Sequence, residues 1–197
     1  KECKSFYKSR NINFDNYDQI QSYMVLGGIP FYLDMLQNNL SLPQNIDKLF
    51  FEKSALLRLE YDRLFSSLFI NPEAYKKVVA LLAKKRIGYT RKEIAEQTKI
   101  PYGGGLSNML RILETNDLII SYIPFGLTKK DIHYKLVDSY CLFYNYFCSE
   151  TNPQFWQQNN LSTKLNSWRG FAFEEVCYSH ISQIKNALGI SGVQTKV

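Results

Sequence analysis

The apolar positions between residues 89 and 138 change their period along the chain, and this change is its clearest structural signal. Apolar side chains recur at helical spacing at 94–98 and again at 106–113, which predicts two amphipathic helices. A Thr-x-x-Glu sequence that begins at Thr90 is a capping box and marks the start of the first helix. Three consecutive glycines at 103–105 then break the helical pattern. The segment is therefore predicted to begin as a helix-turn-helix.

Strand-like sequence follows the second predicted helix. The runs at 119–123 and 133–137 are rich in β-branched and aromatic residues, which is typical of short strands. A Pro-Phe-Gly sequence at 124–126 and a basic pair, Lys129 and Lys130, lie between the two runs. This arrangement predicts the two strands and the basic tip of a wing, so that the whole segment is a winged helix-turn-helix.

The N-terminal part of the chain has a helical period with one conspicuous interruption. Residues 18–69 show helical spacing apart from one glycine-proline interruption, the Gly-Gly-Ile-Pro sequence of 27–30, and a second break at 40–47. Two adjacent glycines permit close backbone approach, and Pro30 suits the first turn of a helix, so the spacing predicts a helix-loop-helix joint. A boundary is predicted at Asn71, because the residue before a proline is pushed out of the helical region.

Helical patterns also dominate the C-terminal part. Residues 139–147 form a strongly aromatic pattern that predicts a helix packed between domains, and residues 170–184 carry apolar side chains at helical spacing. The predicted fold is therefore mainly α, with a small β-hairpin wing as its strand content. It has three predicted parts, namely a helical segment at 1–71, a winged helix-turn-helix at 72–137 and a further helical segment at 138–197.

The distribution of charged residues along the sequence follows the same three parts. Residues 72–137 hold 12 Lys and Arg against 6 Asp and Glu, an excess of +6 that equals the formal net charge of the whole chain. Residues 1–71 and 138–197 are each neutral. A basic winged helix between neutral segments indicates a polyanionic partner such as DNA. The alternative is that the lysines only solubilise a helix surface.

Composition excludes several other classes of protein. A content of 45% hydrophobic and 15% aromatic residues excludes a disordered chain. The sequence has no apolar run long enough to span a membrane and does not begin with a secretory signal, so we expect a cytoplasmic protein without membrane association. Four cysteines without a C-x-x-C pair favour buried free thiols over disulfides or zinc, and no metal site is expected.

A winged helix that engages duplex DNA places its second helix in the major groove, with the early residues of that helix facing base edges. Residues at the wing tip and at the start of the preceding helix then contact phosphate. The candidate base-reading residues are Ser107, Asn108 and Arg111, and the candidate phosphate-binding residues are Arg91, Lys92, Lys129 and Lys130. Because the second helix carries a single basic residue, contact with a partner protein stays an equal alternative.

Three motifs, taken in order, resemble those of a known family. A Tyr-x-x-x-Gly-Gly-Ile-Pro-x-Tyr-Leu sequence at 23–33 precedes the winged helix with its Pro-Phe-Gly, and Trp-Arg-Gly-Phe-Ala-Phe-Glu follows at 168–174. This order resembles the archaeal and bacterial AAA-type (STAND-like) ATPases, and the resemblance covers essentially the whole chain. In that family a P-loop module precedes a helical lid and a winged helix, and the C-terminal region is similar to restriction-endonuclease-like nucleases.

The resemblance implies that the chain is a fragment without the P-loop module. Residues 1–71 would be the lid, and residues 138–197 would be the helical start of an α/β nuclease-like domain. ATP would be the cofactor of the full-length parent, with Gly27, Gly28 and Pro30 close to the nucleotide base. The chain contains no G-x-x-x-x-G-K-[ST] sequence, so we expect it neither to bind ATP tightly nor to hydrolyse it.

By the same resemblance, Glu174 would help to organise metal in a nuclease centre. Such a centre needs further carboxylates and a lysine, normally supplied by strands after this helix, and the sequence ends before them. We therefore assign no catalytic residue and leave open whether the parent is an enzyme. The alternative for Glu174 is an exposed or capping carboxylate near a helix start.

The favoured hypothesis is thus a C-terminal fragment of an AAA-type ATP-binding protein whose winged helix contacts DNA or a partner protein. Two alternatives stay open. One is a stand-alone winged-helix transcription regulator with a helical dimerisation arm. The other is a protein-interaction module without nucleic-acid binding.

Overall fold

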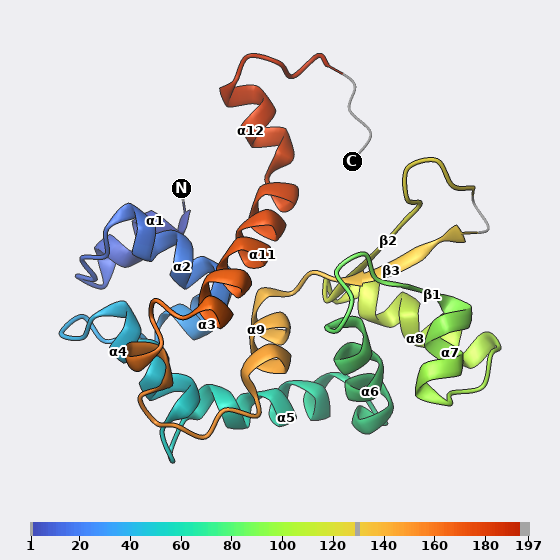
Figure 1. The fold of residues 1–197 in the computed structure, drawn as a ribbon, viewed down its shortest axis with the longest axis horizontal. Coiled ribbons are helices and arrows are strands. Elements are labelled where there is room, and N and C mark those ends of the chain that lie inside the picture. Colours follow the sequence, from blue (N-terminus) through green and yellow to red (C-terminus); the bar gives the residue numbers. More distant parts are fainter. Residues whose placement is uncertain (1, 129–130, 194–197) are drawn as a thin grey trace.

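The computed structural model describes residues 2–128 and 131–193, and it is mainly helical with one small antiparallel sheet, as the sequence predicts. Figure 1 shows two parts side by side: a helical body, formed by residues 2–71 and 138–168, and the winged helix, formed by residues 72–128 and 131–137. The far half of α11 (Thr163–Ser179) and the following α12 (Ile181–Ala187) extend beyond both parts.

Local capping signals set the starts of several helices in the body. Asp15 accepts a hydrogen bond from the main-chain N–H of Asp18 and caps α2, and Ser41 forms a capping box with Gln44 at the start of α4. The helix that starts there continues as a π-helical turn, η1. The N-terminal elements are α1 (Glu2–Ser9), α2 (Asn16–Leu26), α3 (Pro30–Leu33), α4 (Leu42–Ile46), η1 (Asp47–Phe51) and α5 (Leu56–Leu68).

The winged helix follows with the predicted order of elements. They are α6 (Pro72–Leu82), β1 (Tyr89–Thr90), α7 (Arg91–Thr98), α8 (Gly104–Thr115), β2 (Ile119–Tyr122) and β3 (His133–Leu136). The sheet order is β1-β3-β2, and both pairings are antiparallel. The two predicted helices and the two predicted strands are therefore confirmed. The added strand β1 has only two residues, too few to show a period in the sequence.

The C-terminal helices are α9 (Ser139–Phe147), α10 (Phe155–Gln158), α11 (Thr163–Ser179) and α12 (Ile181–Ala187). The helix predicted at 139–147 is confirmed, but the bounds predicted for the next helix, 170–184, are wrong. It starts at Thr163, because Ser162 caps it by accepting the N–H of Leu165 and because Leu165 and Trp168 are buried in the core. It ends before His180, whose backbone is not helical.

An aromatic core joins the C-terminal helices to the N-terminal ones. The Phe143 ring of α9 lies 4.5 Å from the Phe50 ring and 5.3 Å from the Trp168 ring, measured between centroids. Buried Asp47 accepts hydrogen bonds from the main-chain N–H groups of Trp156 and Gln157 and thereby caps α10. Elements far apart in the sequence thus share one core in the helical body.

No helix within residues 2–128 and 131–193 combines the length and the apolar character needed to cross a membrane. All four cysteines are free thiols, and their burial differs. Cys141 is fully buried in α9, Cys3 and Cys177 are half-buried, and Cys148 is exposed. The expectation of uniformly buried thiols is therefore wrong for Cys148, which lies just beyond the C-terminal end of α9.

Candidate nucleic-acid interface

The capping box predicted from the sequence forms at the start of α7. The N–H of Glu93 donates to Thr90 Oγ1 at 3.3 Å, and the N–H of Thr90 donates to Glu93 Oε2 at 2.7 Å. Hydrogen bonding to Thr90, and to Lys85 at 3.2 Å, lowers the pKa of the Glu93 carboxyl. This carboxylate therefore fixes the direction in which α7 leaves the sheet, and with it the position of Arg91.

Arg91 connects the first helix of the motif to the second. Its guanidinium donates hydrogen bonds to the hydroxyl of Ser107 and, at 2.7 Å, to the hydroxyl of Tyr102. The same group lies 4.4 Å from the centroid of the Tyr102 ring. A guanidinium that is held on one side and half-exposed on the other is oriented to bind an anion beside the N-terminus of α8.

The N-terminus of α8 is open to a ligand. Gly103, Gly104 and Gly105 are exposed, and no heavy atom lies within 4 Å of the position that a Cβ atom would take at any of them. No side chain caps the helix at Gly103. The first main-chain N–H groups of α8 therefore face outward without a side chain in front of them, at the positive end of the helix dipole.

One exposed face of α8 carries the candidate base-reading side chains. The Arg111 guanidinium donates to Asn108 Oδ1 at 2.7 Å, and both side chains are exposed. Ser107 is half-buried beside them and contacts Arg91. Leu106, Leu110 and Leu113 are buried on the opposite side. The structure thus brings four of the predicted residues onto one surface, which runs from Arg91 along the exposed face of α8 to Arg111.

The surface described above does not include the other predicted phosphate-binding residues, Lys92, Lys129 and Lys130. The exposed Lys92 side chain lies 4.0 Å from Glu96, its partner one turn later on α7. Lys129 and Lys130 lie outside the described residues. The described interface therefore consists of Arg91, the glycine turn and the exposed face of α8.

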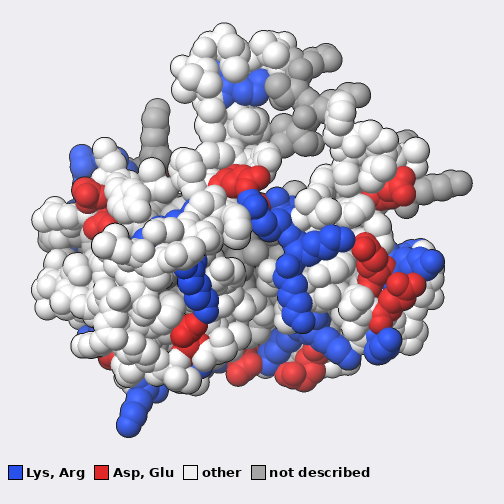
Figure 2. Space-filling view, viewed as in Figure 1, with Lys and Arg blue, Asp and Glu red and all other residues white. Residues whose placement is uncertain are grey.

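Folding redistributes the charge of the winged helix. Three acidic side chains from outside residues 72–137 pair with its basic residues: Asp62 with Lys76, Glu174 with Arg86, and Glu175 with Lys135. The local positive excess is therefore smaller than the sequence count indicates. Figure 2 shows Lys and Arg side chains gathered over α6 and the loop after it.

The Gly-Gly-Ile-Pro joint lies in a different part of the molecule. Gly27 ends α2 with a φ of +62°, and Pro30 begins α3. A Cβ atom on Gly28 would lie 3.2 Å from the Tyr23 ring, so the close approach expected of this glycine is real. In Figure 1 the joint and the winged helix lie on opposite sides of α9. Gly27, Gly28 and Pro30 therefore form no common surface with Arg91 and α8.

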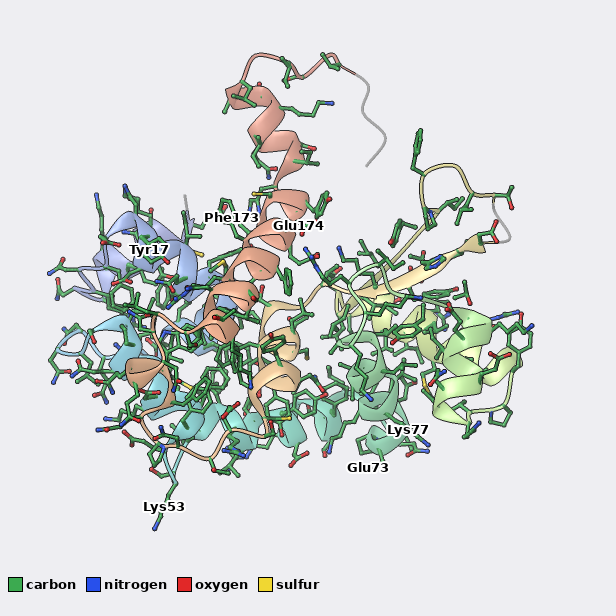
Figure 3. All side chains as sticks on the ribbon, viewed as in Figure 1. Tyr17, Lys53, Glu73, Lys77, Phe173 and Glu174 are labelled. Carbon is green, nitrogen blue, oxygen red and sulfur yellow. The ribbon has the colours of Figure 1, made fainter. Side chains whose placement is uncertain are left out.

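Glu174 has a partner in the winged helix. Figure 3 shows Glu174 and Phe173 on opposite sides of α11, with Glu174 directed toward the winged helix. Its carboxylate forms an ion pair with Arg86. Within the described part of the chain, no group of three or more His, Cys, Asp or Glu side chains is placed to hold a metal ion.

Four residues of these contacts were not singled out from the sequence. Tyr102 orients Arg91, and the ion pairs on α11 use Arg86, Lys135 and Glu175. Tyr102 could have been noticed as an aromatic residue beside the glycine turn. The ion pairs join residues far apart in the chain, so no local pattern announces them.

The fold and this surface together define a winged helix-turn-helix protein built on a helical body. Comparisons with protein-family models, with curated proteins and with solved structures gave no match.

Proposed function

We propose that the winged helix binds duplex DNA through Arg91 and the exposed face of α8, from its N-terminus to Arg111. The observation that carries this proposal is the open surface on which Arg91, Asn108 and Arg111 meet the uncapped, glycine-rich N-terminus of α8. A helix N-terminus without obstructing side chains suits a phosphate, and Asn and Arg side chains suit base edges. The same face is not used to pack the core of the winged helix.

Fluorescence anisotropy with a labelled duplex tests this proposal. Phosphate contacts require that the affinity fall steeply between about 50 and 200 mM salt. We expect Arg111→Ala to raise the Kd roughly thirty-fold, the middle of the range for loss of one base contact. Lys53→Ala removes one positive charge from the helical body, far from α8 (Figure 3), and is expected to leave the Kd within about two-fold. Equal effects of the two variants would count against the proposal.

The wing supports contact with a protein as a second candidate function. Phe125 is 83% exposed at its tip, and Ile123 and Leu127 are 40% and 51% exposed beside it. Exposed aromatic anchors flanked by aliphatic side chains are typical of protein interfaces. If no salt-dependent binding to duplex is measured, this candidate replaces the first one.

We further propose that the chain belongs to a cytoplasmic AAA-type ATP-binding protein. The order of its three motifs supports this assignment, and so does a helical body followed by a winged helix. In that parent, ATP would bind next to Gly27, Gly28 and Pro30, and residues 138–197 would begin a nuclease-like domain. A Walker motif encoded upstream and an E-x-K strand encoded downstream would support the proposal, and their absence from the coding sequence would refute it.

A further inference from the structure

The far half of α11 packs against the hydrophobic core through Ala172 and Val176, which are only partly buried. The buried residues of α11 are Leu165 and Trp168, both in its first half, and α12 has none. Phe173 and Tyr178 are 48% and 44% exposed. A short helical segment whose side chains are at most partly buried is marginal in water, so further contacts with other parts of the molecule are needed to keep it ordered.

The winged helix supplies such contacts along one face of α11. Glu174 forms an ion pair with Arg86, and the Arg86 guanidinium lies 3.9 Å from the centroid of the Phe171 ring. Next to it, the Glu175 carboxylate lies 2.6 Å from Lys135 Nζ, which in turn lies 5.1 Å from the centroid of the Tyr178 ring. Each carboxylate on α11 thus holds a cation that also contacts an aromatic ring of the same helix.

The spacing of the residues on α11 and their burial distinguish these two ion pairs from isolated surface contacts. The positions 171, 174, 175 and 178 share one helix face, since they are separated by three or four residues. The side chains of Lys135 and Glu175 are only 15% and 17% exposed, so solvent and salt screen this pair less than an ordinary surface pair. The pair between Arg86 and Glu174 is about half-exposed and contributes less.

The sheet register places these contacts on the back of the winged helix. Ile119 and Leu136 are paired and buried, on the side of the sheet that faces α8. Lys135 is paired with Ile120, and both therefore point to the other side. Consequently α11 contacts the face of the sheet that is opposite α8, and it does not cover the exposed face of α8.

We propose that this face of α11 is an electrostatic joint that docks the winged helix, and that the far half of α11 stays helical only while the joint is closed. Removal of the positive charges of Arg86 and Lys135 separates the far half of α11 from the winged helix, and it unfolds neither the winged helix nor the helical body. The winged helix keeps its buried residues and its contact with the end of α5, where the ring of Phe69, the residue after α5, stacks on the Tyr75 ring of α6 with centroids 3.9 Å apart. This inference does not depend on nucleic-acid binding.

Amide hydrogen exchange of residues 172–179 tests the joint. The double variant Arg86→Gln/Lys135→Gln alters no residue of α11, so intrinsic exchange rates and helix propensity there are unchanged. We expect its amides at 172–179 to exchange about five-fold faster or more, the result of losing two partly exposed ion pairs. The amides of α8 should keep their wild-type rates. Lys8→Gln/Lys53→Gln removes the same charge from exposed sites in the helical body and should leave residues 172–179 unchanged.

Charge reversal adds a second test. Lys135→Glu alone places two carboxylates together and should accelerate exchange at residues 172–179, whereas Lys135→Glu combined with Glu175→Lys should return it to within about two-fold of the wild-type rate. Unchanged exchange in Arg86→Gln/Lys135→Gln would overturn the proposal. An equal acceleration in α8 would overturn it as well, because that result would mean general destabilisation of the winged helix.

Discussion

Replacing Gly88 with alanine should disrupt the winged helix more than any other single-methyl change at a glycine of this chain. Gly88 is buried between α6 and β1 and has a φ of +72°. A Cβ atom there would lie 2.1 Å from the carbonyl oxygen of Tyr134 and 3.1 Å from the Cα atom of Lys135. Both atoms belong to the main chain of β3, which cannot rotate away as a side chain could.

Two contributions lower the unfolding free energy of the winged helix in Gly88→Ala. Real Cβ contacts essentially never fall below 3.0 Å, so β3 must move by about 0.9 Å at the position where Tyr134 pairs with Tyr89. We expect the loss of that short ladder to cost about 1–3 kcal/mol, the range for one or two main-chain hydrogen bonds. The left-handed backbone adds about 1–2 kcal/mol for a residue with a Cβ atom. The unfolding free energy of the winged helix should therefore fall by about 2–5 kcal/mol.

Alanine substitutions at two other glycines distinguish the steric clash with β3 from the strain of the left-handed backbone. Gly126 has a φ of +82° but open space around its Cβ position, so Gly126→Ala should cost only the backbone contribution of about 1–2 kcal/mol. Gly105 is helical and equally open, and Gly105→Ala should stabilise α8 by about 0.5–1 kcal/mol.

Urea denaturation followed by two probes measures this series. Far-UV circular dichroism reports on all helices, whereas tryptophan fluorescence reports on the helical body, because Trp156 and Trp168 both lie in its core. In Gly88→Ala we expect the dichroism midpoint to fall more than the fluorescence midpoint. If Gly88→Ala loses no more stability than Gly126→Ala, the predicted clash with β3 does not exist and the reasoning fails.

Three further predictions concern the capping box, the core and nucleotide binding. The pKa of Glu93 is lower in the folded state than in the unfolded state, so its contribution to stability is present above the ordinary pKa of 4.5 and is lost as the pH falls through the folded value. The stability difference between wild type and Glu93→Gln, measured by urea titrations from neutral to acidic pH, should therefore shrink as the pH falls, and a constant difference would contradict this. Tyr140→Phe removes the hydrogen bond of 2.6 Å to the Leu57 carbonyl and should cost about 1–2 kcal/mol, while Tyr17→Phe, at a 61% exposed position, should change thermal stability by less than about 0.5 kcal/mol. Titration calorimetry with ATP should detect no tight binding to this chain, and a micromolar Kd would show that residues other than a Walker motif hold the nucleotide.

Local signals in the sequence located the winged helix well. The capping box at Thr90 and the glycines at 103–105 act over a few residues, so they mark the starts of α7 and α8 wherever the segment packs. The bounds of α11 were misplaced for the opposite reason. Its start depends on Leu165 and Trp168, which are buried only in the folded chain, where aromatic rings of α9 and α10 pack against Trp168.

The sequence by itself determined the order of the elements, the break between the two helices of the motif and the positive excess at residues 72–137. Only the tertiary structure decided how that charge is used. Arg86 and Lys135 are held by Glu174 and Glu175, whereas Arg111 stays exposed on α8. The physical reason is that capping and helical period act between near neighbours, while an ion pair between distant segments exists only where packing brings their surfaces together.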